Sequence, residues 1–408
     1  MSIEYLKKKL NSKKSGVLEK YMYYEMKERN TNQSEVIPYR LREKHRSKLG
    51  WCAKAVDSLA DRLIFDGFDD DNFDLMSLFN INNPDILFDS AVLSALISSC
   101  SFIYISKDED GEARMQVIDG ANATGVINPI TGLLTEGYAV LKRNDETDRV
   151  EIDAYFEPYK TTIFDTVNNS VTEFNHKVAY PLLVPIINRP DPKRPFGHSR
   201  ITKACINLQN KAKDTLTRGD ISAEFYSFPQ KYVLGLSEEA EDGFENWKAT
   251  ISSMISLGKD SDGDKPSVGQ FSQQSMEPHI SQFRMYASAF AGETGLTLDD
   301  LGFATENPSS AEAIKASHEN LRLTAKKAQR SFGTGFLNAG YLARCLTDDF
   351  TYERKAVYQT TPKWLPVFEP DSAMLSSIGD GAIKLNQAID GFITPKNLGT
   401  LTGIKGGE

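Results

Sequence analysis

Five prolines between residues 181 and 195 divide this 408-residue chain into two parts of different composition. Proline fixes φ and lacks a backbone N–H, so neither a helix nor a central strand continues through such a stretch. Short segments rich in Val, Ile, Thr, Tyr and Phe precede it, from Phe102 to Val184, and helical patterns follow Gly197. The prolines therefore mark a domain edge, and the two compositions predict an α+β fold.

The part before the prolines combines helices with strands. The stretch "HRSKLGWCAKAVDSLADRLIF" places five residues on one helical face: Leu49, Cys52, Val56, Leu59 and Leu63. The stretch "NPDILFDSAVLSALISSCSFIYIS" predicts an apolar helix that runs into a strand. The pairs Asp110-Gly111 and Asn168-Asn169 suit tight hairpin turns, because these residue types accept positive φ. We therefore expect an antiparallel β region over residues 102–184.

The part after the prolines predicts several helices. One helix is expected over residues 199–225, where Ser199 would be the N-cap and apolar residues recur at spacings of three to five. A polar stretch, 226–276, separates it from a second helix at 277–295. An irregular loop, 296–308, follows. A capping box formed by Ser309 and Glu312 then predicts a long helix over 309–345, which the glycines of "GTGFLNAG", from Gly333, are expected to break.

Charge and composition limit the classes of protein. The formal charge is −9, from 47 Lys and Arg and 56 Asp and Glu, so any contact with DNA would be local or loose. The four cysteines lie far apart without a CxxC pair, which argues against a disulfide framework and a zinc site. No run of about 18 apolar residues or signal-peptide pattern is present, so we expect neither secretion nor a membrane span.

No motif for catalysis stands out. "GHS" at 197–199 resembles a serine elbow, but the second glycine that the elbow needs is replaced by Ile201. "DSDGD" at 260–264 spaces its acids like a calcium loop, but Lys265 and Phe271 stand where that loop requires Gly and Glu. There is no GxxxxGK[ST] phosphate loop and no paired histidine motif. We expect no enzyme activity, no cofactor and no metal site.

The order of these segments resembles that of the portal proteins of tailed bacteriophages, particularly the Gp6-like group. The resemblance is carried by "LVPIINRPDPKRPFGHSRI", the strand and turn before a stem helix, and by "SSAEAIKASHENL", the helix opening after a loop. It implies a portal-like protomer with seven segments: a wing (1–198), a first stem helix (199–225), a small α/β clip (226–276), a second stem helix (277–295), a tunnel loop (296–308), a long wing or crown helix (309–345) and a C-terminal wing or crown segment (346–408).

The resemblance also implies a function. It implies a ring of about twelve copies at one capsid vertex, through which double-stranded DNA is packaged and later ejected. The implied partners are a large terminase, a scaffold protein, the major capsid protein and a head-completion or adaptor protein, with no membrane. The implied location is the virion, and the host cytoplasm during assembly. An acidic channel agrees with this function, because phosphate neutralisation is what makes DNA binding tight.

Two sets of site residues follow from the resemblance. The tunnel loop would line the channel with Leu296, Leu298, Asp299, Asp300, Leu301, Phe303 and Glu306. The clip would dock the terminase through Asp260, Asp262, Asp264 and Lys265. Two alternatives remain: a scaffold or adaptor protein of the virion, which would lack this order of segments, and a packaging-associated nucleic-acid enzyme, which would need a phosphate loop or clustered metal-binding carboxylates.

Overall fold

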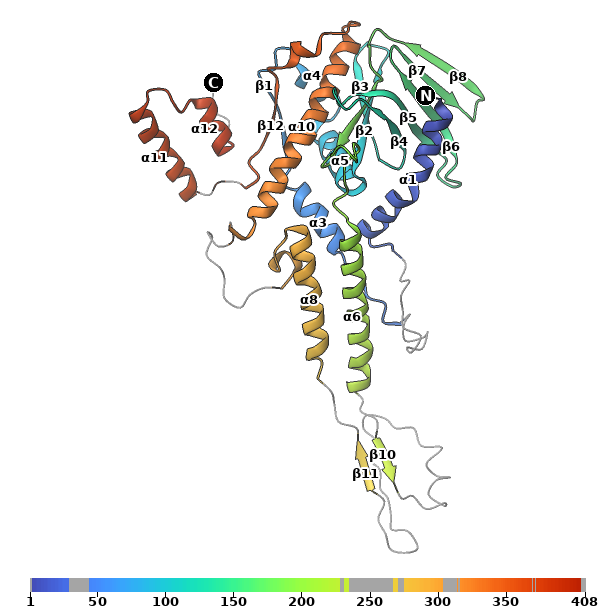
Figure 1. Cartoon of the computed structure of the whole chain (residues 1–408), viewed down its shortest axis with the longest axis vertical. Coiled ribbons are helices and arrows are strands. Elements are labelled where there is room, and N and C mark those ends of the chain that lie inside the picture. Colours follow the sequence, from blue (N-terminus) through green and yellow to red (C-terminus); the bar gives the residue numbers. More distant parts are fainter. Residues whose placement is uncertain are drawn as a thin grey trace, which may run out of the picture. The chain divides into compact units, whose positions relative to one another are not determined.

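A computed structural model describes residues 2–28, 44–227, 231–234, 267–270, 275–303, 314, 316–368, 370 and 372–404 (Figure 1). These residues belong to two compact units. The first consists of Met1–Glu28, Gly50–Ile206 and Phe290–Glu408, and the second of Arg29–Leu49 and Asn207–Ala289. Helices and antiparallel strands are mixed along the chain, which confirms the α+β class.

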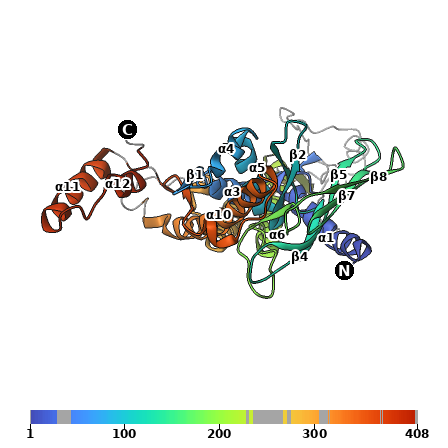
Figure 2. The same ribbon diagram turned by 90° about the horizontal axis from the view of Figure 1, so that it is seen from above.

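Among its described residues, the first unit contains three antiparallel sheets. A five-stranded sheet follows chain order: β4 (Ala123–Ile127), β5 (Leu134–Arg143), β6 (Val150–Glu157), β7 (Lys160–Asp165) and β8 (Ser170–Asn175) (Figure 2). A second sheet has the order β3 (Ala113–Ile118), β2 (Cys100–Lys107) and β9 (Leu183–Ile187), and a third pairs β1 (Phe65–Asp69) with β12 (Thr361–Trp364). Gly111 and Asn169 have positive φ, 89° and 48°, in the β2–β3 and β7–β8 hairpins, so both predicted turns are confirmed.

The helices of this unit differ in what they pack against. They are α1 (Ile3–Tyr24), α3 (Trp51–Ala60), α4 (Leu75–Asn80), α5 (Pro84–Ser98), α10 (Glu319–Thr347), α11 (Ser372–Ala388) and α12 (Pro395–Thr402), with short 3-10 turns η1 (Asp299–Leu301) and η2 (Arg354–Val357). Helix α1 contacts strands of the five-stranded sheet, α5 and α10 contact strands of the smaller sheets, and α11 and α12 contact each other. Helix α5 packs against α1, α3 and β2, and α10 packs against β9, β12 and α4. None of the described helices is long and apolar enough to cross a membrane.

An aromatic cluster forms the part of the core where these helices meet. The ring of Phe65 lies 4.4 Å from that of Phe88, 5.1 Å from that of Phe336 and 5.1 Å from that of Trp364, as measured between centroids. Because these residues come from β1, α5, α10 and β12, the cluster joins the start of the chain to its C-terminal part. Aromatic pairs in such geometry add about 0.5–1.5 kcal/mol each beyond area burial.

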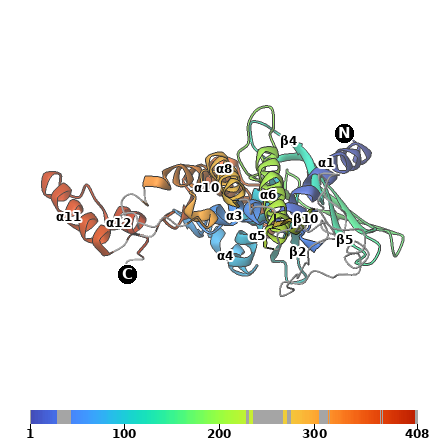
Figure 3. The ribbon, with the colours of Figure 1, turned by 90° about the horizontal axis from the view of Figure 1, so that it is seen from below.

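The second unit contains most of two long helices, α6 (Lys203–Ser227) and α8 (Glu277–Thr294). They run side by side in Figures 1 and 3, and the hydroxyl of Thr215 donates to Oε1 of Gln282 at 3.2 Å. Strand β10 (Lys231–Leu234) pairs antiparallel with β11 (Ser267–Gln270). The rest of the expected clip, including Asp260, Asp262, Asp264 and Lys265, lies outside the described residues.

The expected N-cap of the first long helix is wrong. Helix α6 begins at Lys203, and Thr202 caps it by accepting the N–H of Cys205 at 3.2 Å. Ser199 instead donates its hydroxyl to the carbonyl of Ile97 at 2.5 Å and accepts the N–H of Ile201. The side chain of Ser199 therefore fixes the turn at residues 199–201 to the end of α5, before α6 begins.

The expected helix break at Gly333 is also wrong, because α10 continues to Thr347. The glycines of this stretch are places of close packing. A Cβ at Gly333 would lie 2.7 Å from Cβ of Pro362, and one at Gly340 would lie 3.1 Å from Cε2 of Phe79. Glycine lets β12 and α4 approach the helix backbone, and this packing offsets its low helix propensity. The expected helix start at Ser309 and Glu312 lies outside the described residues.

We predict that Gly333→Ala lowers the free energy of unfolding by about 1–3 kcal/mol, because the added methyl group overpacks the contact with Pro362. Gly16→Ala in α1 is the matched control, since nothing lies within 4 Å of its would-be Cβ. The control should raise stability by about 0.4–1 kcal/mol. Urea denaturation followed by circular dichroism measures both. Stabilisation by both substitutions would contradict the close packing of α10 on β12.

Candidate functional site: the turn after helix α8

A tight turn follows α8 and contains the described part of the expected tunnel loop. Gly295 ends the helix with φ of 70°, and the N–H of Leu296 reaches back to the carbonyl of Ala291 at 3.1 Å. Leu296 is buried, which fixes the start of the turn to the core. The 3-10 turn η1 follows, and Gly302 caps its C-terminal end with φ of 89°. Both glycines stand where the backbone is left-handed, a conformation that other residues adopt at a cost.

Thr297 and Asp300 hold the turn together by reciprocal hydrogen bonds. The N–H of Thr297 donates to Oδ2 of Asp300 at 2.9 Å, and its hydroxyl donates to the same oxygen at 3.0 Å. The N–H of Asp300 donates back to Oγ1 of Thr297 at 3.2 Å. This is the bonding of a capping box, with Asp in the place of the usual Glu. The backbone of the turn is thus fixed by two of its own side chains.

His318 joins the turn to the start of α10. Its Nε2 lies 3.2 Å from Oδ2 of Asp300, and its Nδ1 lies 2.9 Å from the carbonyl oxygen of Ile314. Burial alone would raise the pKa of Asp300, but the hydrogen bonds from Thr297 and His318 outweigh it and lower that pKa. Asp300 is therefore a carboxylate at neutral pH, and it is engaged within its own chain.

A buried arginine fixes the other end of the turn. Nε of Arg200 donates to the carbonyl of Ala55 at 3.2 Å, and a terminal nitrogen donates to the carbonyl of Thr294. Its backbone N–H donates to the carbonyl of Leu96 at 2.7 Å. Arg200 thereby joins the last turn of α8 to α3 and α5. The positive charge of Arg200 also interacts favourably with the negative, C-terminal end of the α8 dipole.

The charge of Arg200 persists in spite of burial. The side chain is buried, and burial lowers the pKa of its guanidinium to about 10, so it remains protonated at neutral pH. A buried charge is costly unless hydrogen bonds satisfy it, and here the bonds come from main-chain carbonyls. Sequence reasoning missed this residue. The available signal was a single Arg between Ser199 and Ile201 in a short segment next to the proline stretch.

Aromatic packing supports the same joint. The rings of Trp51 and Phe290 lie 5.4 Å apart between centroids, and both residues are buried. The hydroxyl of Thr294 donates to the carbonyl of Phe290 at 2.7 Å, which closes the last turn of α8. Helix α3 also contacts η1. The turn is therefore held by packing as well as by hydrogen bonds.

The expected channel-lining residues differ in their environments. Leu298, Leu301 and Phe303 are partly buried, whereas Asp299 is exposed and Asp300 is turned into the local network. Glu306 lies outside the described residues. Among the residues that the structure describes, no group of three His, Cys, Asp or Glu side chains is placed to hold a metal ion. Of the expected acids, Asp299 is thus the one that the described structure exposes.

Comparison with known proteins gives the class of this chain. The profile of the family described as "Phage portal protein, SPP1 Gp6-like" matches residues 3–366, which is most of the sequence. This match assigns the chain to the portal proteins, a non-enzymatic class of structural proteins found in phage virions. The chain belongs to the SPP1 Gp6-like portal family.

Individual relatives share about a quarter of the matched residues with this chain. The portal protein of Mycobacterium phage L5 is 25% identical over 316 residues, covering 72% of this chain and 64% of the relative. That of Mycobacterium phage D29 is 24% identical over 344 residues, covering 79% and 69%. The matched part thus spans about two thirds of the length of these relatives.

Solved structures that resemble the chain include chains of gene transfer agent particles. A chain of the virion of the native particle is 13% identical with a TM-score of 0.47, covering 90% of this chain and 93% of the other. A chain of the neck of the native particle, computed with C12 symmetry, gives the same identity and coverage with a TM-score of 0.45.

We predict that Arg200→Met lowers the free energy of unfolding by about 2–4 kcal/mol, because it leaves buried carbonyls of Ala55 and Thr294 without a donor. Amide hydrogen exchange should also become faster across residues 294–303. The matched control is Arg284→Met on the exposed surface of α8, which should change stability by less than about 0.5 kcal/mol. Equal effects of the two substitutions would argue against the anchoring role of Arg200.

The Asp300 carboxylate should make the turn sensitive to acid. Its pKa is lowered in the folded state, so its contribution is complete above its unfolded pKa of about 3.9 and is lost as the pH falls through the folded value. The difference in thermal midpoint between the native protein and Asp300→Asn should therefore be constant near neutral pH and shrink below about pH 4. Asp299→Asn, at the exposed neighbour, is the control and should differ little at any pH. A difference that persists unchanged into acid would contradict the network.

Proposed function

We propose that this protein assembles into a ring of about twelve copies at one capsid vertex, and that double-stranded DNA passes through the ring during packaging and ejection. Membership of the portal family supports the proposal. The observation that carries it is the turn after α8, which is fixed at one end by Arg200 and at the other by the His318–Asp300 contact. A loop with fixed ends can keep its tip at a constant radius while it adjusts to a moving duplex.

Within this proposal, residues 296–308 are the tunnel loop and line the narrowest part of the channel. Asp299 and Glu306 face the DNA and repel its phosphates, which lets the duplex slide. Leu298, Leu301 and Phe303 pack against neighbouring loops or contact the DNA. Asp300 has a different role from its neighbour, because its carboxylate is bonded to Thr297 and His318.

The remaining segments take the other roles of a portal. Residues 226–276 form the clip, and Asp260, Asp262, Asp264 and Lys265 in it dock the large terminase. The scaffold protein, the major capsid protein and a head-completion protein bind elsewhere on the ring, and assembly takes place in the host cytoplasm. The protein acts as a structural channel and not as an enzyme, which agrees with the non-enzymatic character of its family.

The ring predicts a mass that chromatography can measure. Twelve chains of 45.5 kDa have a combined mass of about 546 kDa. Size-exclusion chromatography with light scattering should show a species of roughly this mass. Monomers or dimers at every concentration, also in the presence of the other capsid proteins, would overturn the proposed ring.

We predict that Asp299→Lys slows DNA packaging several-fold without loss of the ring, because each added cation creates a phosphate contact that must break as the duplex advances. The exposed Asp145 lies in the turn between β5 and β6, so Asp145→Lys is a control with the same charge change and should package normally. Unimpaired packaging by Asp299→Lys would argue against the channel position.

Thiol labelling offers a second readout of the same position. The four native cysteines are all buried, so a reagent should react first with the cysteine of an Asp299→Cys variant. DNA in the channel should suppress this reaction and leave that of Asp145→Cys unchanged. Protection of Asp299→Cys in the empty ring would instead indicate a buried connection.

A further inference from the structure

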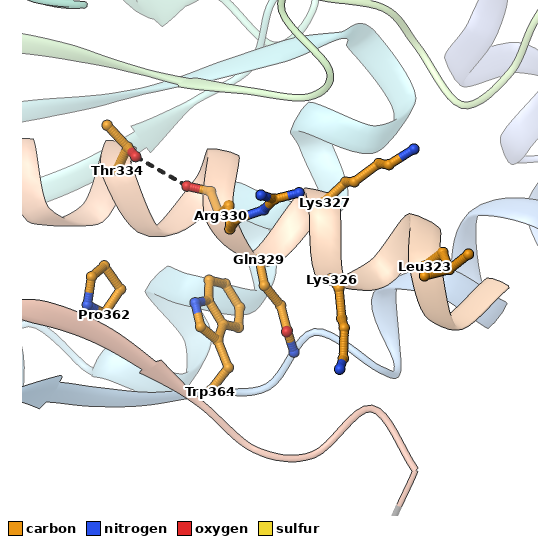
Figure 4. Close-up of a pocket in the computed structure, with 8 residues that line it drawn as sticks. All are labelled: Leu323, Lys326, Lys327, Gln329, Arg330, Thr334, Pro362 and Trp364. Atoms are coloured by element: carbon orange, nitrogen blue, oxygen red, sulfur yellow. Dashed lines mark hydrogen bonds between the residues drawn. The ribbon is translucent and has the colours of Figure 1, made fainter. Parts of the chain in front are cut away.

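Helix α10 and strand β12 form a groove with a volume of about 700 Å³ (Figure 4). The residues that matter here are Leu323, Lys326, Lys327, Arg330, Pro362 and Trp364. Along the chain, the groove begins at Leu323, fifteen residues after the end of the expected tunnel loop at 308. None of the described residues that line the groove belongs to the tunnel loop of the proposal above.

Three positive side chains border the groove. Lys326, Lys327 and Arg330 are exposed on α10, and none of them forms an ion pair with a carboxylate among the residues that the structure describes. Figure 4 shows Lys326 on the side of α10 where Trp364 lies, Lys327 extending to the other side, and the side chain of Arg330 lying along the helix toward Lys327. By contrast, Arg322, one turn earlier, is neutralised by Glu319 at 2.6 Å. On a chain with a formal charge of −9, this is a local site of attraction for negative groups.

The floor of the groove is apolar and held in place. Trp364 packs against Phe65 and Phe336, with centroids 5.1 and 6.1 Å apart, so its indole is fixed by the aromatic cluster. Pro362 lies against Gly333. Leu323, at the end of the groove, keeps 45% of its surface exposed. An apolar side chain that entered the groove would therefore meet a preformed surface.

The combination of floor and border decides between two kinds of ligand. A DNA duplex is convex and would contact the three cations while leaving the concave apolar floor unfilled. A peptide with carboxylates on both sides of an aliphatic or aromatic side chain would satisfy both parts. Arg and Trp are also the residue types that contribute most at protein interfaces, and Arg pairs with carboxylates by two parallel bonds.

We propose that this groove docks an acidic peptide segment of a partner protein, with an aliphatic or aromatic side chain on Trp364 and Pro362 and carboxylates on Lys326, Lys327 and Arg330. Trp364 and Pro362 supply a rigid apolar surface, and the three positive charges speed association and select the partner. Binding through these cations weakens as salt rises, because exposed charges are screened.

A fluorescein-labelled peptide of sequence EDLEFDEL tests the proposal by anisotropy on the intact protein. Lys326→Glu, Lys327→Glu and Arg330→Glu together should weaken its binding at least tenfold. The matched control reverses three exposed lysines on other helices, Lys8, Lys54 and Lys384, to Glu and so makes the same change in net charge. The control should bind like the native protein. Equal weakening by the α10 triple variant and by the control variant would mean that net charge alone attracts the peptide, and it would overturn the proposal.

Two further measurements test the floor and the nature of the ligand. Leu323→Ser should weaken the binding of EDLEFDEL several-fold and leave unchanged the weaker binding of EDSESDES, which lacks apolar side chains. A 20-base-pair duplex that binds more tightly than EDLEFDEL, and loses binding in the triple variant, would assign the cations to nucleic acid and overturn the proposal. Light scattering distinguishes failure of this proposal from failure of the proposed ring. A triple variant that forms the ring but does not bind the peptide supports the groove. A native protein that binds the peptide but forms no ring counts only against the portal assembly.

Discussion

The described part of the turn after α8 depends on one buried charge. Arg200 joins α3, α5 and the end of α8 through carbonyls of Ala55, Leu96 and Thr294. Hydrogen bonds to a charged group contribute about 1.5–3 kcal/mol each, which is enough to retain a guanidinium in a region that otherwise excludes water. Because helix α6 begins only three residues later, the same residue also sets where the chain leaves the sheet part.

The second fixed point works on a different principle. The carboxylate of Asp300 accepts bonds from Thr297 within the turn and from His318 beyond it, so one side chain both shapes the turn and ties it to α10. Asp299, directly before it, has its side chain exposed. Two neighbouring residues of the same type thus have different tasks, and the difference is set by the direction in which a 3-10 turn places successive side chains.

Much of the fold could be predicted from local patterns, because those patterns act locally. The pair Asp110-Gly111 marks a hairpin since only a few residues accept positive φ, whatever surrounds them. Ser199 and Gly333 were misassigned because their roles depend on distant partners. The hydroxyl of Ser199 is taken by Ile97, about a hundred residues earlier, and Gly333 is needed because Pro362 approaches the helix. Arg200 belongs to the same group, since its two side-chain acceptors lie 145 and 94 residues away.

The distribution of charge, like the roles of Ser199 and Gly333, depends on which residues the fold brings together. A net charge of −9 describes the chain as a whole and says nothing of where attraction is possible. Exposed charges are screened over about 10 Å, so an acidic chain can still present a local group of cations that attracts negative groups. On α10 the cations stand beside an apolar floor, where charge alone gives only weak binding. Strong binding there requires a ligand that also fills the floor, and the convex surface of a DNA duplex does not fill it.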